Sequence, residues 1–188
     1  MKKLALFSFL LFSVLFYSCK TKKEEKKEEG FFPVLSFLKS QIKHIDTSLY
    51  QITKLTSRDS TWDTSYIKRE EFHSYATEFL NLPDIAEKSI SSNYEETKFF
   101  DATLNRAIIT YTPKDKSLEI QREEVTIEPD SDNGDKVKNI IINKLVSNKD
   151  SSVTKRMLWT INESFQVTSI VQKPGQEDST NTLKIAWQ

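Results

Sequence analysis

The side chains in this sequence with the most useful reactivity are one cysteine, Cys19, and two histidines, His44 and His73. A histidine acts as a general base when a carboxylate orients it, and here His44 is near Asp46 and His73 is near Glu70 in the chain. However, the sequence has no HExxH motif and no serine in a glycine-containing elbow, and its three glycines form no phosphate-binding loop. We therefore interpret both histidines as surface positions on helices, and we expect a noncatalytic protein without a cofactor.

The acidic stretch PDSDNGDK is the one candidate for a metal site. An EF-hand loop needs glycine at position six and glutamate at position twelve. Counted from Asp130, Gly134 is at position five and Ile141 is at position twelve, so the loop fails at both places. Asn133 and Gly134 instead suit a tight hairpin turn, and a chain with a single cysteine has no Cys-based metal site or internal disulfide. We expect no metal.

The position of Cys19 is explained by what precedes it. Lys2 and Lys3 supply a positive start, Leu4 to Tyr17 form an apolar run, and the small Ser18 ends it. This run is shorter than the roughly 20 residues that span a bilayer, and the order of its parts is that of a secretory signal peptide. Residues 1–18 are thus predicted to be removed on export.

The end of the apolar run resembles a bacterial lipobox, which here consists of Leu15, Phe16, Ser18 and Cys19. Phe16 occupies the position where leucine is common. In having an aromatic residue at that position, the lipobox resembles those of Bacteroidota lipoproteins. The resemblance implies cleavage between Ser18 and Cys19, and attachment of diacylglycerol and of fatty acid such as palmitate to Cys19. The alternative is an incidental cysteine within an ordinary signal peptide.

Residues 19–30 continue as a charged stretch without an apolar side chain after Cys19. Its KKEE blocks place like charges four residues apart, which disfavours a helix, so we interpret it as a flexible tether of at most about 35 Å. Lys23, Glu24 and Glu25 also resemble a signal that sends some Bacteroidota lipoproteins to the cell surface. We expect attachment to the cell outer membrane, with the periplasmic face favoured over the surface.

Residues 31–188 are predicted to form a single α+β domain. After Pro33, apolar residues at helical spacing predict a first helix, and SLYQITKL with WDTSYIK predict a short hairpin. A second helix is predicted from Glu70 to about Asn81. The helix stripe consists of Val34, Leu35, Leu38, Ile42 and Ile45.

Everything after Asn93 reads as antiparallel strands separated by turn residues. In LEIQREEVTIEP, apolar residues change phase between Ile120 and Val125, which predicts a β-bulge near Arg122 to Glu124. The expected fold is one meandering sheet of about six or seven strands, with the N-terminal helices and hairpin packed on one face and the other face partly wet.

The segments FFPVLSFLKSQIKHIDTSLY, LPDI, YTPK, LEIQREEV, DKVK, MLW and SFQ resemble a group of uncharacterised Bacteroidota lipoproteins of the same layout. This resemblance implies a lipoprotein and no particular chemistry. The formal net charge of zero gives no basic excess for nucleic acid, so none is expected as a partner. Two functions stay open: a membrane-anchored accessory module that binds an envelope protein, or a carrier of a lipid or other hydrophobic ligand in a groove between sheet and helices.

Overall fold

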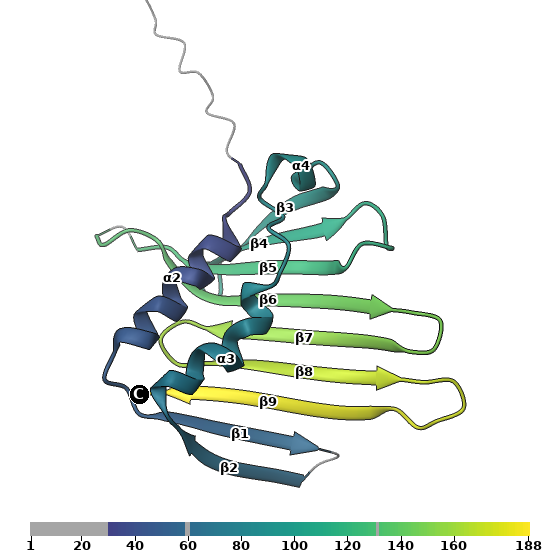
Figure 1. Ribbon diagram of the computed structural model, residues 1–188. Coiled ribbons are helices and arrows are strands. Elements are labelled where there is room, and N and C mark those ends of the chain that lie inside the picture. The colour runs from purple at the N-terminus through teal and green to yellow at the C-terminus, as the bar shows by residue number, and fades with distance from the viewer. Residues whose placement is uncertain (1–29, 59–60, 131) are drawn as a thin grey trace, which may run out of the picture. The chain divides into compact units, whose positions relative to one another are not determined.

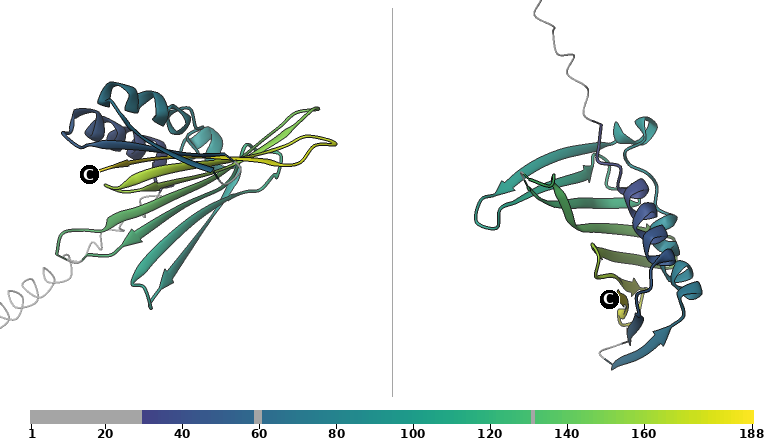
Figure 2. Two further views of the ribbon diagram at one scale, coloured as in Figure 1. Left: turned by 90° about the horizontal axis from the view of Figure 1, so that it is seen from below. Right: turned by 90° about the vertical axis from the view of Figure 1, so that its left-hand side faces the viewer.

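The computed structural model describes residues 30–58, 61–130 and 132–188. Phe31–Gln188 form one compact unit. In this unit an antiparallel sheet is packed against two long helices, which both lie on the same face (Figures 1 and 2). The predicted α+β class and antiparallel sheet are therefore confirmed in this broad form.

The described residues form a sheet of nine strands, so the expected count of six or seven is wrong. Seven consecutive hairpin-linked strands make the predicted meander, and the early hairpin continues the same sheet instead of packing on it. The strand order is β2-β1-β9-β8-β7-β6-β5-β4-β3. The strands are β1 (Ile52–Arg58), β2 (Thr61–Ile67), β3 (Tyr94–Asp101), β4 (Arg106–Pro113), β5 (Ile120–Glu128), β6 (Lys136–Ser147), β7 (Ser152–Thr160), β8 (Ser164–Gln172) and β9 (Ser179–Trp187).

The pairing of β1 with β9 explains the larger count. Ile52 pairs with Trp187 and Arg58 with Asn181, so the whole length of β1 bonds to the last strand of the chain. Without this pairing, β9 would expose a row of backbone N–H and C=O groups. The alternation of apolar residues along a strand indicates its buried face but not its neighbour, which is why the sequence did not reveal this long-range pairing.

The helices α2 (Val34–Thr47) and α3 (Arg69–Leu80) lie where the apolar spacing predicts them, and a short helix, α4 (Lys88–Ser91), follows. In α2 the predicted stripe is buried except for Leu35, which is half-buried. The Arg69 guanidinium joins the two long helices: it donates to the carbonyl oxygens of Ile45 (3.0 Å) and Tyr50 (3.2 Å) and to Ser48 Oγ (3.0 Å). Because the last carbonyls of a helix lack partners within it, Arg69 satisfies the end of α2 from the start of α3.

A register shift between Ile120 and Arg122 interrupts the pairing of β5 with β6. It lies at the start of the predicted bulge region and has the expected effect, since Ile120 and Val125 are both buried. The same shift turns Glu123 toward the helix-covered face, where its side chain is 3% exposed. An acidic residue therefore occupies a core position, which the sequence did not indicate.

Candidate functional site

The residues predicted to act in export and anchoring are Ser18, Cys19, Lys23, Glu24 and Glu25, and all lie outside the described residues. No helix within the described ranges is long and apolar enough to cross a membrane.

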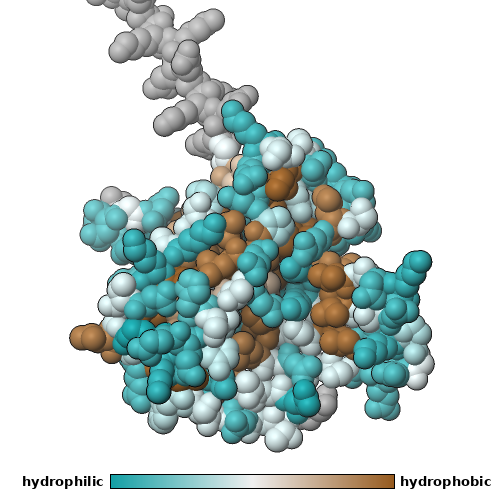
Figure 3. Space-filling view, in the orientation of Figure 1, coloured by the Kyte–Doolittle hydropathy of each residue, from teal (hydrophilic) through white to brown (hydrophobic). Residues whose placement is uncertain are grey.

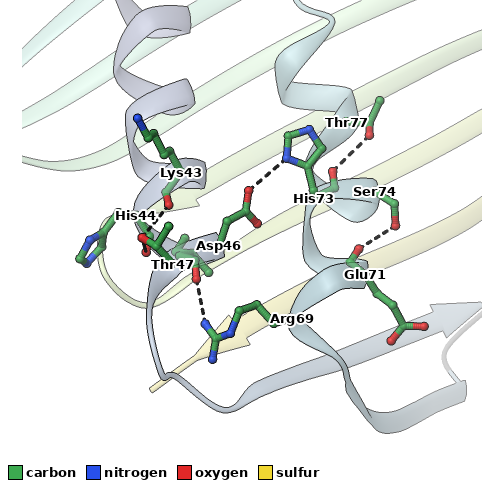
Figure 4. Close-up of polar contacts among 10 residues, drawn as sticks. Lys43, His44, Asp46, Thr47, Arg69, Glu71, His73, Ser74 and Thr77 are labelled. Atoms are coloured by element: carbon green, nitrogen blue, oxygen red, sulfur yellow. Dashed lines mark hydrogen bonds and ion pairs between the residues drawn. The ribbon is translucent and has the colours of Figure 1, made fainter.

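The two histidines lie on different helices, and His73 has a partner from across the helix pair (Figure 4). His73 Nδ1 lies 3.1 Å from Asp46 Oδ2, so the carboxylate that is near His44 in the sequence is oriented toward His73. The His44 ring packs edge-on against Tyr50 instead. Both histidines are exposed, and the His73 side chain retains 61% of its accessible surface. The contact between His73 and Asp46 holds α2 against α3 at the surface.

In the acidic loop between β5 and β6, the Asp130 carboxylate accepts hydrogen bonds from groups of the same turn. Asp130 accepts hydrogen bonds from the backbone N–H groups of Asp132 (3.0 Å) and Asn133 (3.1 Å) and from Lys136 Nζ (2.6 Å). Gly134 has a φ of +80°, a left-handed conformation that glycine adopts without strain. These contacts are those of a hairpin turn. Within the described ranges, no three His, Cys, Asp or Glu side chains are grouped as metal ligands.

The space between the helices and the sheet is filled by aromatic side chains of the protein. Phe79 of α3 meets the rings of Trp159 and Phe165 edge-on at 5.1 and 5.3 Å between centroids. Phe72 packs in the same way against Trp187 at 5.7 Å. These five rings are at most 3% exposed. Edge-to-face packing at these distances fills the space between α3 and the middle of the sheet, so these aromatic rings are not available to a ligand.

A hollow of about 560 Å³ opens beside α3 and is lined by residues of β1, β2, β8 and β9. These strands extend past the helix (Figure 1). Its apolar floor is formed by Val167 and Leu183, which pair across β8 and β9. We call it the α3 hollow; its other lining residues, mostly polar, are Thr56, Ser57, Arg58, Thr61, Asp63, Glu78, Ser169, Asn181 and Thr182.

Two of the three charged side chains of the α3 hollow, Arg58 and Glu78, have fixed partners. Arg58 Nε donates to Asn181 Oδ1 at 3.2 Å, and Glu78 Oε2 accepts from Lys155 Nζ at 2.7 Å. These contacts leave an aliphatic floor of two side chains inside a rim that carries both charge signs. The arrangement offers hydrogen bonds and a small apolar contact.

Three valines extend this apolar surface on the same face of the sheet. Val146 pairs with Val153, and Val153 pairs with Val171, so one row crosses β6, β7 and β8. Val146 is 44% exposed and the other two are half-buried. Figure 3 shows a band of apolar side chains over these strands, beside the helices. We call these residues the valine row.

The buried Glu123 is the most perturbed acid in the described core. Tyr111 of β4 and Ile142 of β6 flank it in the sheet, and its Oε1 atom is buried without a hydrogen-bond partner. Burial, followed by the nearby Asp84 carboxylate, raises the pKa of Glu123 to about 8. Burial is also the main cause of raised pKa values at Tyr94 and Tyr111. The Glu123 carboxyl is therefore mostly neutral at pH 7.

The start of the domain forms a lid over Tyr111, the neighbour of Glu123 on β4. The Phe31 ring packs against Tyr111 in a tilted arrangement with 4.5 Å between centroids, and the Phe32 N–H donates to Tyr111 Oη at 2.8 Å. Glu123 lines none of the five best-formed pockets in the described part of the chain. Glu123 is thus a buried structural acid, and the phase change in β5 was the only sequence signal near it.

Comparison of the chain with protein-family models, curated proteins and solved structures gives no match.

Proposed function

We propose that this protein is a membrane-anchored bacterial lipoprotein that serves as a noncatalytic binding or accessory module of the cell envelope. Its anchor is the lipidated Cys19, and its partner is another envelope protein. The binding surface is the α3 hollow together with the valine row.

The observation that carries this proposal is the arrangement of apolar surface on the helix side of the sheet. The five aromatic rings between the helices and the sheet are enclosed in the core, whereas Val146 and Leu183, with the nearly buried Val167, form a shallow aliphatic surface within a polar rim. An apolar centre with a polar rim is the usual composition of a protein interface.

Site-specific photo-crosslinking of the full chain in its native membranes tests this surface. A photoreactive residue at Ser169, on the side of the α3 hollow, should yield one protein adduct. The matched control is Thr168, the adjacent residue on β8, whose side chain points to the opposite face of the sheet. Val171→Lys should abolish the adduct at Ser169 without changing membrane attachment. Equal adducts from both positions, or none from Ser169, would contradict the proposal.

The second candidate function is a carrier of a lipid or other hydrophobic ligand. The volume of the α3 hollow favours it, because about 560 Å³ lies within the usual range of ligand pockets. The lining opposes it, since the floor has two aliphatic side chains and no aromatic ring. We therefore prefer the protein-binding function.

The proposed location is the cell outer membrane, with the periplasmic face favoured. Scrambling the lysines and glutamates of residues 20–29 should not change the location if they form a tether, because a tether depends on length and overall composition rather than on residue order. Replacing Lys23, Glu24 and Glu25 with alanine removes the candidate export signal. Protease treatment of intact cells measures the outcome. We expect protection in both the parent and the variant; digestion of the parent that disappears in the variant would reassign the protein to the cell surface.

A further inference from the structure

Strand β2 forms one free edge of the sheet. Free edges in native proteins usually carry charges, prolines or bulges that prevent pairing with another strand. The opposite edge, β3, follows this rule with Glu95, Glu96, Lys98 and Asp101. Along its seven residues, β2 carries one charge, Asp63, and pairs with β1 in unbroken register. The β2 edge is therefore suited to pairing with another strand.

The hydrogen-bond pattern shows which residues of β2 face outward. Gln51 and Gln188 exchange both backbone bonds, at 3.0 and 3.3 Å, so they mark a hydrogen-bonded pair at the start of the β1–β9 ladder. Because bonded and non-bonded pairs alternate in antiparallel sheets, Thr53, Leu55 and Ser57 bond to β9, and the residues between them bond to β2. The alternation leaves outward N–H and C=O groups on three residues of β2: Trp62, Thr64 and Tyr66.

These three residues also place their side chains on the face of the sheet away from the helices. Trp62 is 56% exposed and Tyr66 is 74% exposed. Their cross-strand neighbours on β1 are Ser57 and Thr53, which are too small to cover the rings. Two aromatic side chains thus border the free edge, two residues on either side of Thr64.

We propose that β2 pairs with β2 of a second copy of this chain, antiparallel, about a two-fold axis at Thr64. In this register the outward groups of both strands meet, with Thr64 opposite Thr64 and Trp62 opposite Tyr66 of the second copy. Two cross-strand aromatic pairs form, and such pairs stabilise sheets. Asp63 lies opposite Ser65 of the second copy, so no like charges meet. The interface is isologous, as closed two-fold dimers require.

The dimer forms through the outer edge of β2, whereas the α3 hollow lies on the helix side of the sheet and shares only Thr61 and Asp63 with that strand. The proposed pairing does not depend on the proposed binding function. Each chain would join its nine-stranded sheet to that of its partner, with both valine rows left free.

Cysteine crosslinking of the full chain in its native membranes tests the pairing. Thr64→Cys should give a disulfide-linked dimer in most of the protein, because facing residues in such a pair are about 5.5 Å apart between Cα atoms, a distance that a disulfide spans. Thr97→Cys on β3 is the matched control, since Thr97 is an exposed threonine at the other free edge, on the same face of the sheet. It should stay monomeric. No dimer from Thr64→Cys, or equal dimer from both variants, would overturn the proposal.

Two further variants test the register and the backbone bonds. When chains with Trp62→Cys and Tyr66→Cys are produced together, the mixed disulfide should exceed either like-with-like disulfide; the reverse order would refute this register. Thr64→Pro removes an outward N–H and no bond to β1, so it should abolish the dimer. At a dilution where the parent is also monomeric, the variant should keep the melting temperature of the parent. A dimer that survives this change would also overturn the proposal.

Discussion

Replacing Glu123 with glutamine should remove a strong pH dependence from the stability of the protein. The pKa of Glu123 is about 8 in the folded chain, against an ordinary value of 4.5, so between these values the folded state holds one proton more than the unfolded state. Stability from this group is therefore fully present below pH 4.5 and is lost as the pH rises toward 8. The slope is about 1.4 kcal/mol per pH unit, which gives a total of about 4 to 5 kcal/mol.

Urea unfolding of residues 31–188 between pH 4 and pH 9 measures this effect, with tryptophan fluorescence as the signal because Trp159 and Trp187 are buried. Relative to the parent, Glu123→Gln should gain stability steadily from pH 5 to pH 8. The matched control is Glu95→Gln, which removes an exposed acid on β3 and should keep the slope of the parent. Equal slopes in the parent and in Glu123→Gln would refute the assignment of a buried, neutral carboxyl.

Arg69→Ala should lower the free energy of unfolding by about 1–3 kcal/mol, because it leaves the carbonyls of Ile45 and Tyr50 without their partner; urea unfolding measures this, and an unchanged midpoint would contradict the role of Arg69 in joining the helices. Calcium should leave the melting temperature of the domain unchanged, because Asp130 is engaged within its turn; a saturable rise that is lost in Asp132→Ala would reveal a site. Cys19→Ser should release the protein from membranes or stall precursor cleavage, because several acyl chains at about 0.8 kcal/mol per CH₂ provide the anchor; unchanged fractionation and processing would exclude lipidation there.

Local patterns were sufficient to predict the two long helices and most strands. The spacing of Val34, Leu38 and Ile42 predicts α2, and the phase change in β5 predicts the bulge that the register shift confirms. Both signals arise from neighbours within a few residues, where backbone geometry determines which side chains share a face.

Features that depend on distant segments were not predictable. The pairing of Ile52 with Trp187 joins residues far apart in the chain, and nothing local to either strand specifies it. The α3 hollow likewise depends on how far β8 and β9 extend past α3, which combines three separate element lengths. Glu123 was missed for a related reason: its burial follows from the bulge together with the lid of Phe31 and Phe32 over Tyr111.

Mass spectrometry of the protein extracted from its own membranes tests the central claim, a lipid-anchored binding module, most directly. Spectra of one sample under native and denaturing conditions separate covalent from non-covalent lipid. We predict a chain that begins at Cys19 with diacylglycerol and fatty acid attached, and no additional lipid released on denaturation. A chain with an unmodified Cys19 would contradict the anchor, and a hydrophobic ligand retained at fixed stoichiometry would contradict the binding module in favour of a carrier.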